Sequence, residues 1–443
     1  MEHAAKSKLR LFDAVKQGNH KLLKLLLKRR GHLINDADDL GRTLLYLAAE
    51  NGHHKIVKLL LKEEVVDVNK SDIYHQSPLY MAAAKGHDRI VSLLLERKEV
   101  NADQQDAFGA NPLWLAAGKG HDKVMKLLLQ RTEVQVNLTP SDGGQTSLWM
   151  AALTGNTKIV KLLLQRDGID VNRPDKDGCA PLNMAAGKGH DGVVSLLLER
   201  EDIDVNQQDH HGTTPLWVAA AKGFENVVRL LLGKDGINVN QATRDGHQSS
   251  LFMAVLMGND NVVKLLLERG DINVNQADKD DVTPLQVAAG KGHTNIVRLL
   301  LQRSDIDVNQ ANKFGFSPLY MAANDGYVES VELLVCHMDI NLTKACKNGF
   351  TPLGLALRRR DQKGGERFEQ IVNLLKERIQ RPKDEIQTCI ICLDQRAEVV
   401  LLPCGHQNMC SPCAFQWNEE KKGCPCDRMR ISEILPLFKR LKL

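Results

Sequence analysis

The sequence predicts a mostly helical fold in which a solenoid of stacked helix pairs precedes a small zinc-stabilised module. The solenoid is predicted by a pattern of apolar residues, proline or serine, and glycine. This pattern recurs every 34 or 35 residues between residues 9 and 375, and such a fixed period is typical of solenoids. The module is predicted by seven of the ten cysteines, which fall with one histidine between residues 389 and 426 at spacings that suit tetrahedral Zn²⁺.

Composition sets limits on the class of protein. A chain of 443 residues is too long for one compact core. Its 59 basic and 55 acidic residues leave a net charge of +4, which gives little support for nucleic-acid or membrane partners. The sequence has no run of about 18 apolar residues and opens without an apolar leader segment. Cysteines clustered at metal-binding spacing then favour a reducing compartment, so we expect a cytoplasmic or nuclear protein.

The repeats are in register from end to end. A degenerate unit with Leu11–Val15 at the same phase precedes ten clearer ones, which makes about 11 repeats. The proline position of each clear repeat is occupied, in order, by Leu44, Pro78, Pro112, Ser147, Pro181, Pro215, Ser250, Pro284, Pro318 and Pro352.

Each repeat contains signals for two helices, as residues 209–240 illustrate. Gly212 lies in a turn, and Thr214-Pro215 reads as a helix N-cap followed by the first helical residue. Gly223 would end this helix in a left-handed conformation, and Val227–Leu232 supplies the apolar face of a second, outer helix. The predicted glycine caps are Gly18, Gly52, Gly86, Gly120, Gly155, Gly189, Gly223, Gly258, Gly292 and Gly326.

This pattern resembles the ankyrin repeat, which implies antiparallel helix pairs, hairpin loops and a protein-binding surface. The family usually ends its Thr-Pro-Leu-His motif in histidine, whereas this chain often has an aromatic residue there. One interpretation is packing between neighbouring repeats. The other is an aromatic stripe that contacts a protein substrate, because interfaces favour Trp and Tyr. The candidates for such a substrate groove are Tyr80, Trp114, Trp149, Trp217 and Tyr320.

The repeat array is expected to span residues 5–376, with its first and last repeats acting as caps whose outer faces meet water. The first repeat is rich in lysine. The last contains the run from Arg358 to Gly365, which we expect to be a solvated loop. A short polar linker, 377–387, should follow, since Pro382 argues against an unbroken helix there.

The cysteine-rich segment resembles a RING finger, expected over residues 388–430 and followed by an apolar tail, 431–443. The resemblance implies two structural zinc ions with alternating ligand pairs. The first would be held by Cys389, Cys392, Cys410 and Cys413, and the second by Cys404, His406, Cys424 and one further residue. Four protein ligands leave no open position for water, so neither site would be hydrolytic.

Two adjacent residues are candidates for the eighth zinc ligand. The family normally ends Cys-Pro-x-Cys, whereas this chain reads Cys424-Pro425-Cys426-Asp427. Keeping the family spacing places Asp427 in the ligand position, and a carboxylate can ligate Zn²⁺ at about 2.0–2.2 Å. Cys426 is the alternative, with a softer thiolate but a shorter reach.

The resemblance also implies contacts with a ubiquitin-conjugating enzyme. Ile390, Trp417 and Pro425 match the apolar contact positions, and Arg428 matches the residue that hydrogen-bonds both the conjugating enzyme and ubiquitin. The planar guanidinium of Arg428 suits that task because it donates several hydrogen bonds at once. The competing interpretation is that Ile390 and Trp417 only form the small core of the module.

Together these features predict a RING-type E3 ubiquitin ligase. The repeats would bind a protein substrate and the RING would recruit a ubiquitin-charged conjugating enzyme, with no covalent ubiquitin intermediate on this chain. The alternative is a non-catalytic scaffold whose zinc module mediates dimerisation or partner binding. The Pro403–Cys413 segment is similar to inhibitor-of-apoptosis and Mind bomb RINGs, which implies a homodimer through the RING and the tail. Nucleic-acid and membrane partners are not expected.

Overall fold

A computed structural model describes residues 2–380, 398–399 and 416–417 of the chain. These residues fall into two compact units. The first unit consists of residues 2–219 and 226–237, and the second of residues 220–225 together with the described residues from 238 onward. Within the part of the chain that is described, no helix is long and apolar enough to cross a membrane.

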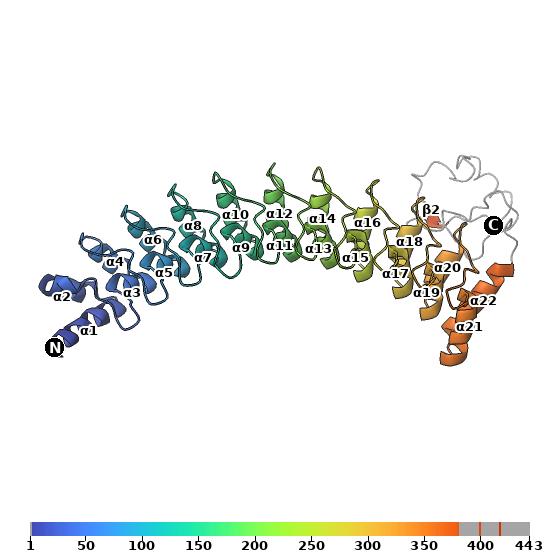
Figure 1. Ribbon diagram of the computed structural model, residues 1–443, viewed down its shortest axis with the longest axis horizontal. Helices are drawn as coiled ribbons and strands as arrows, with labels where there is room; N and C mark the ends of the chain where they lie inside the picture. The colour runs from blue at the N-terminus through green and yellow to red at the C-terminus, as the bar shows by residue number, and fades with distance from the viewer. Residues whose placement is uncertain (1, 381–397, 400–415, 418–443) are drawn as a thin grey trace. The chain divides into compact units, whose positions relative to one another are not determined.

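The first unit is built from helix pairs whose members form two rows (Figure 1). We call the odd-numbered helices inner and the even-numbered helices outer. Inner helices pack against inner helices of the next repeat, as α5 does against α7, and outer helices pack likewise against outer helices. The elements are α1 (Glu2–Lys16), α2 (His20–Arg30), the short 3₁₀ helix Gly31–Leu33, α3 (Leu44–Glu50), α4 (His54–Leu60), α5 (Pro78–Lys85), α6 (Asp88–Leu95), α7 (Pro112–Lys119), α8 (Asp122–Leu128), α9 (Ser147–Thr154), α10 (Thr157–Leu164), α11 (Pro181–Lys188) and α12 (Asp191–Leu198).

The second unit repeats the same arrangement and ends in a longer pair of helices. Helices α13 (Pro215–Lys222) and α14 (Glu225–Leu232) contain residues of both units. The following elements are α15 (Ser250–Met257), α16 (Asp260–Leu267), α17 (Pro284–Lys291), α18 (Thr294–Leu301), α19 (Pro318–Asp325), α20 (Val328–Val335), α21 (Pro352–Lys363) and α22 (Glu366–Gln380). Two short strands, β1 (Glu398–Val399) and β2 (Gln416–Trp417), pair antiparallel, with Glu398 opposite Trp417.

Local signals explain where the inner helices begin and end. At α5 the Ser77 hydroxyl accepts a 3.1 Å hydrogen bond from the Tyr80 amide, and Pro78 occupies the first helical position, where no amide donor is needed. Gly86 ends the helix with φ of 73°. A Cβ on Gly86 would lie 2.7 Å from the His121 ring, so both the backbone angle and the close approach require glycine. All ten predicted glycine caps have φ between 69° and 80°, which confirms them.

The core runs between the two rows of helices. In α5, Ala82 and Ala83 are fully buried, because small side chains let the partner helix approach closely. In the adjoining α6, Ile90, Val91 and Leu94 are at most 1% exposed. Fully burying one such aliphatic side chain contributes about 1.5–3 kcal/mol. Because the same positions recur in every repeat, the core continues along each unit.

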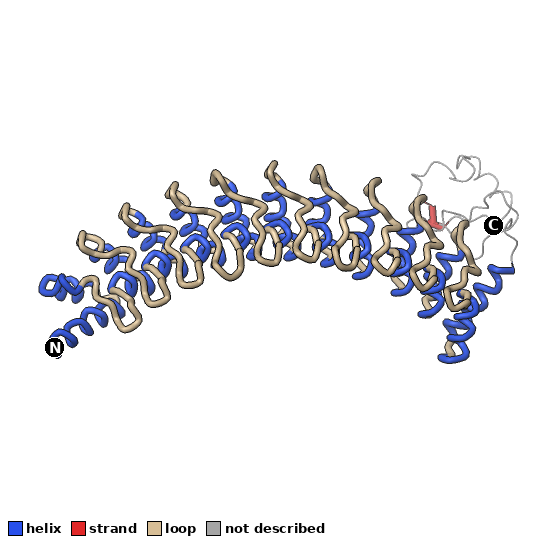
Figure 2. The backbone as a smooth tube through the Cα atoms, in the orientation of Figure 1, coloured by secondary structure: helices blue, strands red, loops and turns tan. Residues whose placement is uncertain are grey.

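Hairpin loops precede the inner helices and form a second series of contacts between repeats (Figure 2). In the hairpin 72–76, Oδ1 of Asp72 accepts hydrogen bonds from the amides of Tyr74 and Gln76 and so shapes the turn. The amide of Ile73 donates to the carbonyl of Leu40 at 3.0 Å. Neighbouring hairpins are therefore joined directly through their backbones.

The structure corrects two expectations near the end of the array. The arginine run is helical rather than a loop, since α21 continues through Arg360 to Lys363 and ends before Gly364. The expected linker 377–387 begins as helix, since α22 extends to Gln380. No helix-breaking residue occurs before Pro382, and Nε of Arg378 donates a 2.9 Å hydrogen bond to the carbonyl of Val335, which anchors this turn to α20.

Candidate functional site

The aromatic residues of the inner helices reach into the hairpin of the following repeat. The Tyr46 hydroxyl donates to Oδ2 of Asp72 at 3.0 Å, and the Tyr80 hydroxyl donates to Oδ2 of Asp106 at 2.6 Å. Two tryptophans form the corresponding hydrogen bond to a backbone carbonyl of the next repeat. Nε1 of Trp114 donates to the Gln145 carbonyl at 2.9 Å, and Nε1 of Trp149 donates to the Cys179 carbonyl at 3.0 Å. Each side chain thus ties one repeat to the next.

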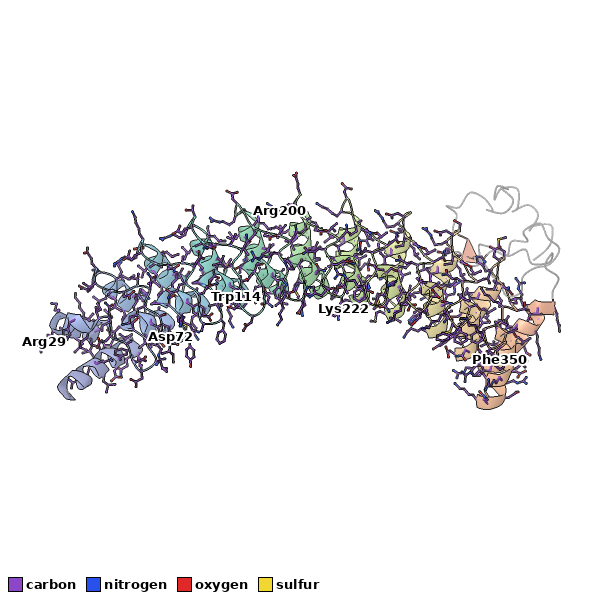
Figure 3. All side chains as sticks on the ribbon, in the orientation of Figure 1. Arg29, Asp72, Trp114, Arg200, Lys222 and Phe350 are labelled. Carbon is purple, nitrogen blue, oxygen red and sulfur yellow. The ribbon has the colours of Figure 1, made fainter. Side chains whose placement is uncertain are left out.

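Burial separates the five predicted groove residues into two groups. Tyr80, Trp149 and Tyr320 are only 6–7% exposed, so packing between repeats accounts for them. Trp114 and Trp217 are half-buried, and for them a groove contact stays a prediction. Figure 3 labels Trp114 on the inner helices, and Arg200, in the turn that follows α12, on the opposite edge of the same unit.

The tyrosine hydroxyls remain donors over a wide pH range. Burial raises the pKa of Tyr80, and the hydrogen bond to Asp106 raises it further. Burial and then Asp72 act in the same direction on the pKa of Tyr46. In the second unit, burial together with Cys346 raises the pKa of Tyr320 to about 12, and this ring stacks on Phe316 with 4.6 Å between centroids.

Amide side chains replace the aromatic residues in two repeats and preserve the connection. Nδ2 of Asn183 donates to the carbonyl of Thr213 at 3.2 Å, and Nε2 of Gln286 donates to the equivalent carbonyl, that of Phe316. In six repeats this position therefore supplies a hydrogen-bond donor at the end of an otherwise packed side chain, whereas Phe252 and Gly354 at the equivalent position have no side-chain donor. Sequence reasoning missed this role, although the mixture of Tyr, Trp, Asn and Gln was a visible signal for it.

A second series of side chains connects the loops that follow the outer helices. Nδ2 of Asn69 donates to the Glu99 carbonyl at 2.7 Å, while Oδ1 accepts from the Asn101 amide at 2.8 Å. The paired bonds recur at Asn35, Asn137, Asn172, Asn240, Asn275 and Asn309. We call this series the asparagine ladder.

Asp103 interrupts the asparagine ladder. One carboxylate oxygen accepts from the Gln135 amide at 2.9 Å and the other from Nδ2 of Asn111 at 3.3 Å. An ionised carboxylate has no donor, so the bond to the next carbonyl cannot form. Burial raises the pKa of the Asp103 carboxyl, which means that the charged form is disfavoured at this position.

The predicted zinc and conjugating-enzyme contacts lie almost entirely outside the described residues. These are Cys389, Cys392, Cys404, His406, Cys410, Cys413, Cys424, Cys426 and Asp427 for zinc, and Ile390, Pro425 and Arg428 for the enzyme. Trp417 is described as part of β2, paired with Glu398. The donor set itself fits zinc, because thiolates and an imidazole are its preferred ligands. In the remainder of the described chain, no three His, Cys, Asp or Glu side chains form a cluster suited to a metal ion.

Comparison with protein-family models identifies both parts of the chain. The model described as ankyrin repeats (3 copies) matches five overlapping segments: 11–106, 98–175, 167–243, 241–312 and 304–382. The model described as zinc finger, C3HC4 type (RING finger), matches residues 385–434. The RING finger is a zinc-binding fold, which agrees with the donor set.

Curated relatives match over short stretches in the RING region. The chain is 41% identical over 51 residues to the "Probable E3 ubiquitin-protein ligase XBOS34" of Oryza sativa subsp. japonica, covering 12% of this chain and 10% of that protein. It is 38% identical over 52 residues to the "Putative E3 ubiquitin-protein ligase XBAT35" of Arabidopsis thaliana, covering 12% and 11%. The "E3 ubiquitin-protein ligase SPL1" of Arabidopsis thaliana matches at 34% over 59 residues, covering 13% and 16%. The matches therefore span only about a tenth to a sixth of these relatives.

Among solved structures, the crystal structure of the ankyrin repeat domain of Bcl-3 is similar to this chain. The alignment covers 51% of this chain and 98% of that one at 25% identity, with a TM-score of 0.45.

Proposed function

This chain belongs to the ankyrin-repeat family and carries a RING finger near its C-terminus, and we propose that it acts as a RING-type E3 ubiquitin-protein ligase. The observation that carries this proposal is the RING match over residues 385–434. Relatives matched in that region are named as E3 ubiquitin-protein ligases. The repeats would supply the substrate-binding part of the same molecule.

The proposed mechanism requires no nucleophile from this chain. The RING would hold a conjugating enzyme through Ile390, Trp417 and Pro425, and Arg428 would hydrogen-bond both that enzyme and ubiquitin. The repeats would hold a protein substrate so that one of its lysines can attack the thioester. The rate gain would come from proximity and from a fixed orientation of the thioester-linked ubiquitin.

Two zinc ions would stabilise the module without taking part in the chemistry. Cys389, Cys392, Cys410 and Cys413 would hold one ion. Cys404, His406 and Cys424 would hold the other, with Asp427 or Cys426 as its fourth ligand. Structural zinc contributes on the order of 10 kcal/mol to the folding of such small modules, so Cys392→Ser should unfold it.

An autoubiquitination assay tests the proposal. Full-length protein would be incubated with activating enzyme, a panel of conjugating enzymes, ubiquitin and ATP. We expect ladders that are lost in Ile390→Ala and kept in Ile391→Ala, a control of the same size at the neighbouring position. Zinc content would be measured for each variant to show that the module is folded. Full activity of Ile390→Ala would contradict the assigned contact surface.

The second candidate is a scaffold without ligase activity, and the Cys426-Asp427 departure from the family pattern favours it. Under this candidate, protein that holds two zinc ions would form no ladder with any conjugating enzyme. Dimerisation through the RING and the tail 431–443 is compatible with both candidate functions, the ligase and the scaffold. Light scattering on full-length protein with and without residues 431–443 tests it, and a monomer mass for both would contradict it. A cytoplasmic or nuclear location is part of the same proposal.

A further inference from the structure

Large apolar side chains are exposed at the tips of three successive hairpins in the first unit. Leu40 is 42% exposed, Ile73 54%, Tyr74 52% and Phe108 61%. These four side chains, which we call the apolar tips, belong to the hairpins 36–42, 70–76 and 104–110. Exposed apolar groups that gather at one place usually mark an interaction surface, whereas isolated ones need no explanation.

Backbone hydrogen bonds make the apolar tips contiguous. The Ile73 amide donates to the Leu40 carbonyl at 3.0 Å, and the Ala107 amide donates to the Tyr74 carbonyl at 2.9 Å. The three hairpins therefore lie side by side with fixed spacing. Because packed helices lie about 8–10 Å apart, successive tips should present apolar groups at roughly that interval.

The side chains that anchor these hairpins are not available to a partner. Asp72 and Asp106 are 8% and 9% exposed, and each accepts a hydrogen bond from a tyrosine of the preceding inner helix. The carboxylates that anchor the second and third hairpins are therefore buried and already hydrogen-bonded. Their exposed apolar groups contribute nothing visible to the packing of the repeats, which leaves recognition as their use.

Exposed aromatic side chains in the hairpins of the second unit differ from the apolar tips, because a cation lies over each ring. Nζ of Lys313 lies 5.2 Å from the Phe314 ring centroid, and the guanidinium of Arg358 lies 5.3 Å from that of Phe350. The structure shows no such cation over the rings of Tyr74 or Phe108 among the residues that it describes.

The surroundings of the apolar tips are acidic. The three hairpins contain five acidic residues and two basic ones. Both bases are engaged, since Arg42 pairs with Asp38 at 2.9 Å and Nζ of Lys70 donates to the Asn35 carbonyl at 3.0 Å. In the described part of the chain, Asp36 and Asp39 form no ion pair, and Asp39 is exposed. Because acidic residues outnumber basic ones in the three hairpins, the net charge beside the tips is negative.

We propose that the apolar tips bind a linear protein segment that carries two or three bulky apolar side chains and basic residues beside them. A segment in the polyproline II conformation has three residues per turn and rises about 3.1 Å per residue, so apolar residues three positions apart share one face and match the spacing of the hairpins. The basic residues would face Asp36 and Asp39. This inference rests on the proposed function, for which it supplies the chemical class of substrate.

Peptide selection on zinc-loaded full-length protein tests the proposal. Random 12-residue peptides displayed on phage would be enriched on the protein, and the Kd of two enriched peptides would be measured by fluorescence polarisation. We expect enriched peptides to have a positive net charge and at least two bulky apolar residues. The Ile73→Ser/Tyr74→Ser/Phe108→Ser variant should weaken binding by at least about tenfold.

The matched control is Leu25→Ser/Val65→Ser, which removes two apolar side chains that are 64% and 71% exposed elsewhere in the first unit. It should change Kd by less than about twofold. Enrichment of acidic or purely polar peptides, no enrichment at all, or equal binding by the triple variant would each overturn the proposal. Autoubiquitination needs no substrate segment, so ladders retained by the triple variant would show that the proposed ligase function stands whether or not this inference does.

Discussion

The hydroxyl of Tyr80 donates a 2.6 Å hydrogen bond to Asp106, which lies 26 residues further along the chain in the hairpin of the next repeat. Asp106 also accepts 2.9 Å bonds from the amides of Phe108 and Ala110. One buried carboxylate therefore shapes a hairpin and fixes it to the preceding helix. The same relationship joins Tyr46 to Asp72.

Tyr80→Phe should loosen the hairpin 104–110. Hydrogen bonds to charged groups contribute about 1.5–3 kcal/mol, and Asp106 would lose one of its donors while staying buried. Hydrogen exchange measured by mass spectrometry should show faster exchange at Phe108 and Ala110. Tyr74→Phe, which alters a half-exposed hydroxyl, is the control and should leave these amides within about 0.5 kcal/mol of wild type. Equal effects of both variants would contradict the assigned bond.

Tyr320 should make the second unit sensitive to alkali. Its pKa is raised from 10.0 to about 12 by burial and by Cys346. Between these values the unfolded chain loses the phenol proton and the folded chain keeps it, so the free energy of unfolding falls as pH rises. Urea denaturation from pH 9 to pH 12 should show a shallower fall for Tyr320→Phe than for wild type. If the free energy of unfolding fell equally with pH in wild type and in Tyr320→Phe, Tyr320 would ionise alike in the folded and unfolded chain, which contradicts the prediction.

Asp103→Asn should restore the missing bond of the asparagine ladder at the cost of the 3.3 Å bond from Nδ2 of Asn111. Because the substitution also removes a half-buried charge, the variant should stabilise the first unit by up to about 1 kcal/mol at pH 7. The raised pKa of Asp103 means that ionisation destabilises the folded state. The advantage of asparagine should therefore shrink as pH falls from neutrality, first through the raised pKa of the folded Asp103 carboxyl and then toward the ordinary pKa of an aspartate in the unfolded chain.

Asp170→Asn is the control for Asp103→Asn. Asp170 lies two residues before Asn172. Its side chain acts only as a hydrogen-bond acceptor, since Oδ1 accepts from the Asn172 amide at 3.1 Å. Asparagine keeps that acceptor, so urea denaturation at pH 7 should show little change. A gain at Asp170 equal to that at Asp103 would point to reduced charge, rather than to the ladder bond, as the cause.

Gly86→Ala should destabilise the first unit by about 1–3 kcal/mol, because alanine is strained at φ of 73° and its Cβ would meet the His121 ring at 2.7 Å. Gly31→Ala is the control, since Gly31 has φ of −58° and no atom within 4 Å of the position of a Cβ. Thermal unfolding followed by circular dichroism would compare the two variants. A neutral Gly86→Ala would contradict the role given to the glycine caps.

Features encoded within a few residues were predictable from the sequence. The Ser77-Pro78 start and the Gly86 end of α5 were found because capping depends on adjacent residues. The Tyr80–Asp106 bond was not found, since its partners are far apart in sequence and several residue types can donate at that position. The helical course of Arg358–Arg360 was also missed, because charged residues are as common in solvated helices as in loops.

The same distinction applies to the candidate sites: those set by neighbouring residues were predictable from the sequence, and those set by the packing of distant residues were not. Zinc ligands recur at short spacings, so the pairs from Cys389 to Cys424 could be proposed directly, whereas Cys426 and Asp427 are adjacent and spacing alone does not choose between them. The apolar tips were not found, because their exposure depends on how the hairpins 36–42, 70–76 and 104–110 stack.

The most direct test of the ligase proposal is discharge of ubiquitin from a charged conjugating enzyme to free lysine. In a single-turnover reaction with activating enzyme quenched, full-length protein should accelerate loss of the thioester. Ile390→Ala should abolish that acceleration while retaining its zinc. Discharge at the rate of the conjugating enzyme alone, across a panel of such enzymes and with two zinc ions bound per chain, would contradict the account and favour the scaffold.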